Sequence, residues 1–267
     1  MLYNIEKSLI LKEIKMYIIP LTERAGFLAG MAPKFKGYTS TFPCRSIRCF
    51  NDILFAATNL YAYGTPFANP MAGNQPHYLT ADIPHLAIIL TPFVEKVWKY
   101  FNDEPNTPNT QANFDAFQEE LCDDFGRIIA NDGRYVHTYG NCQKMVNMLF
   151  KYLTCFGDYD DFADLFSYCH IPIDRNILES FRNNYGVANI TSNMKYRYTN
   201  VTTGGVEEEP WSRISKDAYK SLLAAYRAAL VSVKGNHSWL GLEYYIWRGA
   251  SIPTTGTHAT PIENFQR

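Results

Sequence analysis

Apolar residues recur at intervals of three and four positions along most of the chain, which is the spacing of helices. The clearest run covers residues 141–156, where Val146, Leu149, Phe150 and Leu153 would share one face and Gly157 would end the helix. Similar spacing predicts further helices over 45–63, 83–101, 114–129, 160–168, 212–231 and 240–247, and from Ile177 to Phe181. The pattern therefore predicts a mainly α fold.

Segments rich in Pro, Gly, Asn and Thr interrupt these helices. Residues 25–43 and 64–78 are typical of irregular surface chain. Pro92 lies inside the predicted helix 83–101 and should kink or split it. Alternation of side chains near 195–201 predicts, at most, a minor hairpin.

The length of 267 residues and the hydrophobic content of 46% allow a substantial core. We expect a single helical domain over 1–267. It would be either one compact, bundle-like unit or two closely packed helical lobes. The segment 102–113, rich in Asp, Asn, Pro and Thr, is the place where a boundary between such lobes would fall.

Charge and cysteine content narrow the class of protein. The formal net charge is −1, so a polyanionic partner would have to meet a local basic patch. The six cysteines show neither a CxxC pair nor a zinc-finger spacing, and no secretory signal opens the chain. Charged residues also interrupt the apolar positions of the first twenty residues, which excludes a membrane span there. We expect reduced thiols and a soluble, cytoplasmic protein without membrane contact.

Several common catalytic motifs are missing from the sequence. It contains no GxGxxG, P-loop, HExxH or GxSxG motif, and its six histidines have no short metal-ligand spacing. Dehydrogenase, kinase and zinc-hydrolase functions are therefore disfavoured, and neither a metal nor a cofactor is expected.

One stretch carries candidate chemistry. Lys144 stands at the start of the clearest helix, four positions after Gly140, and Asp174 follows the turn His170-Ile171-Pro172-Ile173. Over residues 138–180 this arrangement resembles the catalytic segment of the helix-hairpin-helix DNA glycosylases, and its long interval resembles the archaeal branch that acts on oxidised guanine. In this family a lysine follows a glycine-containing hairpin, and an aspartate follows a Pro-Val-type turn.

The resemblance implies a DNA glycosylase with lyase activity, and therefore DNA repair. Lys144 would be the nucleophile that attacks the sugar of a modified nucleotide, and Asp174 the carboxylate that stabilises the developing positive charge. A free lysine is protonated and inert near neutral pH, so the amine would need burial or a helix N-terminus to react. No cysteine quartet for an iron–sulfur cluster follows.

DNA is the partner that this resemblance implies. Backbone N–H groups near Gly140 would hold a phosphate. Gln143, Lys151 and His170 complete the predicted nucleic-acid-binding residues.

Structural roles explain the same residues equally simply. Lys144 would cover apolar surface with its stem, and Asp174 would cap a helix. Lys151 would pair with the acidic run 158–164, and His170 would pack in the core. The alternative function is then a non-catalytic helical module that binds nucleic acid or a protein, such as a subunit of a phage or defence assembly.

Overall fold

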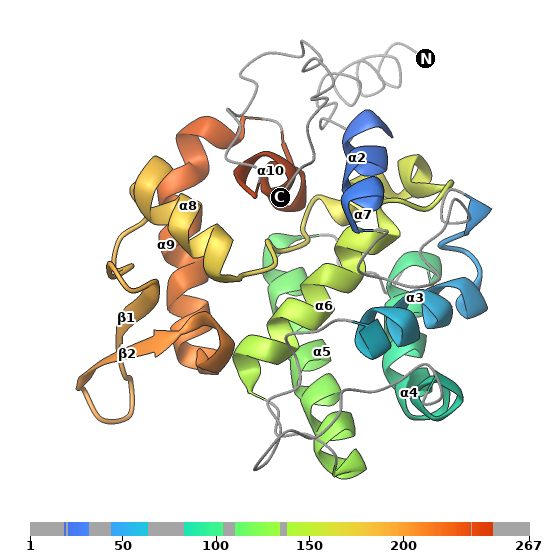
Figure 1. Cartoon of the computed structure of the whole chain (residues 1–267), viewed down its shortest axis with the longest axis horizontal. Coiled ribbons are helices and arrows are strands. Elements are labelled where there is room, and N and C mark those ends of the chain that lie inside the picture. Colours follow the sequence, from blue (N-terminus) through green and yellow to red (C-terminus); the bar gives the residue numbers. More distant parts are fainter. Residues whose placement is uncertain are drawn as a thin grey trace, which may run out of the picture.

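The computed structural model describes residue 19 and residues 21–31, 44–63, 83–103, 110–133, 138–235 and 237–247. Within these residues the fold is mainly α, as predicted (Figure 1). The elements are the helices α2 (Leu21–Met31), α3 (Phe50–Tyr63), α4 (Ile83–Asn102), α5 (Gln111–Asp132), α6 (Tyr139–Leu153), α7 (Ala163–Phe166), α8 (Arg175–Asn184), α9 (Lys216–Lys234) and α10 (Trp239–Ile246), the 3-10 turns η3 (Tyr159–Phe162) and η4 (Trp211–Arg213), and the strands β1 (Lys195–Thr199) and β2 (Val206–Pro210).

Buried apolar side chains form two clusters that meet beside α6. The first takes its members from Ile19 to Cys169 and from α10, and the second begins at Ile171 and continues through α8, β1, α9 and α10. The segment 102–113 does not separate the clusters, because Phe101 before it and Phe114 after it belong to the same one. The change from one cluster to the other occurs at His170.

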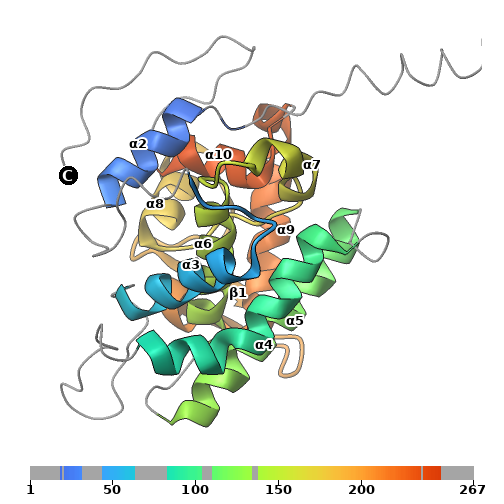
Figure 2. The same cartoon turned by 90° about the vertical axis from the view of Figure 1, so that its right-hand side faces the viewer.

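Two helices join the clusters. Figure 1 shows α6 at the centre, where α5 crosses it, with α8 and α9 on one side and α3 and α4 on the other, and Figure 2 shows α4 and α5 side by side. Tyr139, at the start of α6, packs against both clusters. On α10, Leu240 and Tyr244 belong to the first cluster, whereas Leu242 and Ile246 belong to the second. The two cores therefore share elements of one continuous structure.

Helix α6 confirms the predicted apolar stripe but has different ends. Its four predicted core residues are buried. The helix begins at Tyr139, because Thr138 caps it by accepting a hydrogen bond from the Asn141 N–H at 3.2 Å. It ends at Leu153 rather than 156, because the following turn tightens and Phe156 donates to the Leu153 carbonyl. Gly157 is not its cap, since its N–H donates to the Arg45 carbonyl at 3.0 Å.

Three other predictions about elements need correction. Part of the expected irregular chain 25–43 is helical, because Phe27 on α2 packs into the first core. The predicted helix 160–168 is two short turns, η3 and α7, because Phe162 leaves helical geometry with φ −115°. Pro92 does not split α4. Both Pro92 and Ile88 are exposed, so the proline lies on the outer face of the helix.

The predicted hairpin is present. β1 pairs with β2 in antiparallel register, with Arg197 opposite Glu208 and Tyr198 opposite Glu207. The guanidinium of Arg197 contacts the Glu208 carboxylate across the strands. Since β2 runs directly into η4, the hairpin determines where Trp211 begins its turn.

None of the described helices is long and apolar enough to cross a membrane. All six cysteines are free, and only Cys44 and Cys49 are exposed. The first eighteen residues and the predicted loop 64–78 lie outside the described residues.

Candidate functional site

The side chains of Lys144 and Asp174 meet in the structure. Nζ of Lys144, on α6, donates to Oδ2 of Asp174, at the start of α8, over 3.1 Å. The two side chains keep only 14% and 17% of their exposure, so the pair is largely screened from water. The two predicted catalytic side chains therefore lie at hydrogen-bonding distance from each other.

Asp174 also caps α8, as the structural interpretation predicted. Its Oδ1 accepts a hydrogen bond from the Ile177 N–H at 3.0 Å, and its backbone is extended. One carboxylate oxygen thus serves the helix cap and the other serves the lysine. The carboxylate is fixed from two directions.

Trp211 supplies an aromatic wall to this pair. The Lys144 Nζ lies 4.8 Å from the centroid of the Trp211 ring, within the range of a cation–π contact. Trp211 is partly exposed. The ammonium of Lys144 consequently lies between a carboxylate and an aromatic face.

Gln143 is buried and does not face a nucleic-acid surface. Its Nε2 donates to the Ile173 carbonyl at 2.9 Å, and its Oε1 accepts from the Ile173 N–H at 3.2 Å. The side chain has no exposed surface. The prediction of a nucleic-acid contact is corrected here, because the amide is used in holding the turn before Asp174.

Gly140 is also enclosed by the protein. A Cβ at this position would lie 2.1 Å from the Trp211 carbonyl oxygen, because the backbone of η4 passes directly over α6. The predicted phosphate contact near Gly140 is therefore corrected to a close helix–turn packing contact. Glycine is required for this approach.

Lys151 is buried in an aromatic cage. Its ammonium pairs with Glu243 on α10, and both side chains are 2% exposed. The rings of Phe27 and Tyr244 lie 4.1 and 4.7 Å from its Nζ. Neither a nucleic-acid contact nor a pair with the acidic run 158–164 is formed, because Lys151 points inward toward α2 and α10.

Burial and the lysine act in opposite directions on Glu243. Desolvation raises the pKa of this carboxyl, and the adjacent Lys151 only partly offsets the effect. The same carboxyl interacts electrostatically with Asp174 and Lys144. The two ion pairs along α6 therefore belong to one electrostatic group.

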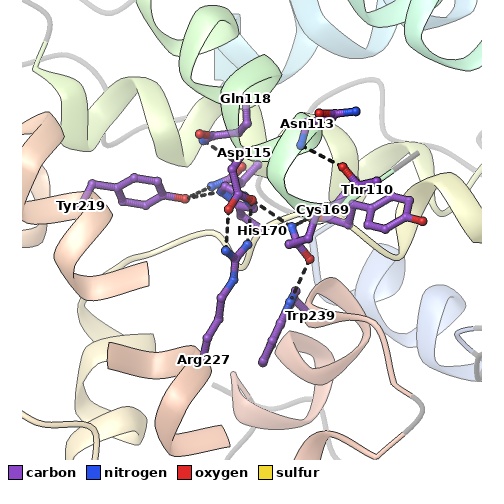
Figure 3. A network of polar contacts seen from close by, with 12 residues as sticks. Thr110, Asn113, Asp115, Gln118, Cys169, His170, Tyr219, Arg227 and Trp239 are labelled. Carbon is purple, nitrogen blue, oxygen red and sulfur yellow. Dashed lines mark hydrogen bonds and ion pairs between the residues drawn. The ribbon is translucent and has the colours of Figure 1, made fainter. Parts of the chain in front are cut away.

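His170 is buried as well, so the prediction that it contacts nucleic acid is corrected and the core interpretation holds. Its Nε2 lies 2.8 Å from Oδ1 of Asp115, and its Nδ1 lies 3.0 Å from the hydroxyl of Tyr219 (Figure 3). Arg227 binds the same carboxylate through two N–H groups, at 2.6 and 2.9 Å.

Hydrogen bonding assigns the protons of this network. Burial would raise the pKa of Asp115, but hydrogen bonds from Arg227 and His170 outweigh it and hold the pKa below its ordinary value. An ionised carboxylate only accepts hydrogen bonds, so Nε2 of His170 carries hydrogen and Nδ1 accepts from Tyr219. Burial lowers the pKa of His170, which keeps the ring neutral. The Tyr219 oxygen in turn accepts from Asn147 at 3.0 Å.

A cavity of about 350 Å³ opens beside this network, between α5 and α9. Asp115, Tyr139, Tyr219 and Arg227 are among its lining residues, whereas Lys144 and Asp174 are not. The charges around it neutralise one another, as in the pair of Arg227 with Asp115. This cavity therefore does not unite the predicted catalytic residues.

Sequence reasoning missed the partners of the buried polar residues. Asp115, Tyr219 and Glu243 belong to no local motif and reach their partners across long intervals of chain. One signal was present in the sequence: Gln143 and Asn147 are four positions apart on α6, where both are buried. No group of His, Cys, Asp and Glu side chains suited to a metal ion occurs in the part of the chain that the structure describes.

Comparison with family models, with curated proteins and with solved structures found no match to this chain.

Proposed function

We propose that this chain is a DNA glycosylase with an associated lyase activity, in which Lys144 is the nucleophile and Asp174 the catalytic carboxylate. One observation carries the proposal, the contact of 3.1 Å between the Lys144 amine and the Asp174 carboxylate. A nucleophile and a carboxylate that act on one sugar carbon must lie near enough to reach it together, and this contact meets that condition.

The reaction follows from this contact. The Lys144 ammonium passes a proton to Asp174, and the freed lone pair forms a bond to C1′ of the damaged nucleotide. The glycosidic C1′–N bond breaks, its electron pair leaves with the base, and the base takes the proton back from Asp174. A proton then moves from the Lys144 nitrogen to O4′ as the C1′–O4′ bond breaks, which opens the sugar ring and leaves a protonated imine between Lys144 and C1′. Loss of a proton from C2′ forms a C2′–C3′ double bond, the C3′–O bond breaks, and the 3′ phosphate leaves with its electron pair, which nicks the strand.

The surroundings of the pair suit a charged transition state. Partial burial strengthens the interaction of the Asp174 carboxylate with a positive sugar carbon. The partly exposed Trp211 offers a ring face beside the amine, and aromatic faces stack well on unpaired bases. DNA is the partner that this chemistry requires.

A non-catalytic binding module is the competing proposal, and a specific observation favours it. Both carboxylate oxygens of Asp174 already have partners, in the helix cap and in the ion pair. The pair then serves to hold α6 against α8, where the two cores meet.

Borohydride trapping separates these two proposals. The full chain is incubated with duplexes that carry an abasic site or an oxidised, alkylated or deaminated base, and borohydride then reduces any imine to a stable amine. We expect a covalent protein–DNA adduct, located at Lys144 by peptide mass spectrometry. The variant Lys144→Gln should lose the adduct and the strand nicking while still binding the duplex.

The control is Lys216→Gln, which removes a lysine that is ion-paired with Glu119 and Asp123 on α5 rather than with Asp174. This variant should keep the wild-type yield of adduct. Equal trapping by Lys144→Gln and the wild type, or binding without any adduct in the wild type, would exclude the enzymatic proposal and leave the binding module.

A further inference from the structure

The strongest unassigned feature is the pairing of Gln143 with the peptide of Ile173. The side-chain amide donates to the carbonyl and accepts from the N–H of the same residue, as a neighbouring strand would. Its remaining hydrogen-bonding positions contact the Gly140 carbonyl and the Asn147 side chain, at 2.9 and 3.2 Å. The amide of Gln143 is thus fully used and fixed in one orientation.

This contact lies directly next to the Lys144–Asp174 pair. Gln143 precedes Lys144 on α6, Ile173 precedes Asp174 in the turn, and both contacts span thirty positions of chain. The two segments therefore meet in two consecutive cross-links. The first link fixes the backbone, and the second lies at the candidate site.

The turn is held at other points as well. His170 is bonded to Asp115 and Tyr219, and the side chains of Ile171 and Ile173 are buried in the second core. Gln143 adds the hydrogen bonds to the peptide immediately before Asp174. Its loss would leave both polar groups of the buried Ile173 peptide without these partners.

We propose that Gln143 is a positioning residue, which holds Asp174 against Lys144 by binding the Ile173 peptide. Its effect on reaction rate rests on the function proposed above, whereas its effect on the position of Asp174 can be measured without that function. A displacement of about 1 Å at a catalytic group can cost on the order of 100-fold in rate. Small movements of this turn would consequently be visible in kinetics.

Three variants of the full chain test the proposal. Gln143→Leu keeps a buried side chain but removes both bonds to Ile173. Gln143→Glu restores the pattern of donor and acceptor only while the introduced carboxyl is protonated. Asn59→Leu is the matched control, since Asn59 is also a buried amide but bonds to the Phe55 carbonyl on its own helix rather than to the turn.

Amide hydrogen exchange measures how firmly the turn and the Asp174 cap are held. In Gln143→Leu, exchange at Ile173 and at Ile177, whose N–H binds Asp174, should accelerate by about tenfold or more. In Asn59→Leu both amides should keep their wild-type protection, even where the melting temperature falls. Unchanged exchange at Ile177 in Gln143→Leu would overturn the positioning role.

Kinetics provide the second measurement. The rate of adduct formation should fall on the order of 100-fold in Gln143→Leu with little change in DNA affinity, and should stay near wild type in Asn59→Leu. For Gln143→Glu, the rate relative to wild type at the same pH should be highest at low pH and fall as the introduced carboxyl ionises. A ratio of the two rates that does not change with pH would contradict the positioning role of Gln143, because a merely structural residue would give no new pH dependence.

The two proposals fail in different ways. If the wild type forms no adduct but exchange at Ile177 still responds to Gln143→Leu, the proposed function fails and the positioning of Asp174 stands. If the wild type forms the adduct and Gln143→Leu forms it at the same rate, the positioning role fails and the function stands.

Discussion

Lys144 and Asp174 are joined by an ion pair of 3.1 Å although thirty positions of chain separate them. They meet because the residues before them are also joined: the side-chain amide of Gln143 is hydrogen-bonded to the backbone of Ile173. A polar contact between distant segments is thus supported by a second contact one residue away. This arrangement fits a catalytic pair and a structural joint equally in geometry, so the two interpretations must be separated by the effects of substitutions.

Substitution of Asp174 separates its two roles. Asp174→Ala removes the helix cap and should lower the free energy of unfolding by about 1 kcal/mol beyond the loss in Asp174→Asn, because asparagine also caps helices well. Asp174→Asn removes the charge and should slow base release by orders of magnitude if the site is catalytic. Urea unfolding and the release of the modified base measure the two effects.

Equal stability of Asp174→Ala and Asp174→Asn would contradict the capping role of Asp174. Unchanged base release in Asp174→Asn would instead contradict the catalytic role of the carboxylate.

Much of the fold follows from local spacing. The run Val146, Leu149, Phe150 and Leu153 predicts a helix because an apolar stripe must be buried to be stable, and the stripe is buried. Asp174 predicts a helix start because its short side chain reaches the third residue after it. The exact ends are less predictable, because the end of α6 depends on hydrogen bonds of the following turn rather than on Gly157.

The candidate site was less accessible to sequence reasoning. That Lys144 approaches Asp174 was implied by a family resemblance, not by spacing along the chain. Gln143 and Lys151 are polar side chains on a helix, which normally face water. Their burial is possible only because Ile173 and Glu243, from distant segments, supply the matching polar groups. Such long-range matches leave no local pattern.

Removal of Lys151 should destabilise the fold strongly. Lys151→Met leaves the buried carboxyl of Glu243 without its partner, which typically costs about 3–5 kcal/mol. The double variant Lys151→Met, Glu243→Leu should recover most of this loss, since an apolar pair of similar size suits the surrounding rings of Phe27 and Tyr244. A double-mutant cycle by chemical unfolding measures the coupling. Additive effects of the two single substitutions would show that the pair is not coupled.

The buried His170 predicts a dependence of stability on pH. Burial lowers its pKa in the folded chain below the ordinary value of 6.5. As the pH falls below about 6.5, the unfolded chain therefore binds a proton that the folded chain does not bind, and stability decreases. The free energy of unfolding, measured between pH 7 and pH 5, should fall in the wild type.

The control for this prediction is His170→Gln, which has no ring to protonate. Its stability should fall less over the same interval, even though it starts lower. A parallel decline in both proteins would assign the pH dependence to other groups.

Gly140→Ala should disturb the aromatic wall of the candidate site. The new methyl group would lie 2.1 Å from the carbonyl oxygen of Trp211, a backbone atom that moves only if η4 moves. We expect a loss of about 1–3 kcal/mol in the free energy of unfolding, as for other overpacked contacts. The shift should carry the indole away from Lys144, because Trp211 is the first residue of the displaced turn. Tryptophan fluorescence should therefore change in the folded protein.

Gly205→Ala is the matched control, since its methyl group would meet only the Thr203 side chain at 3.4 Å, and its stability should stay within about 0.5 kcal/mol of wild type. If Gly140→Ala keeps wild-type stability and wild-type fluorescence, η4 does not lie against α6. The contact of Trp211 with Lys144 would then be contradicted as well.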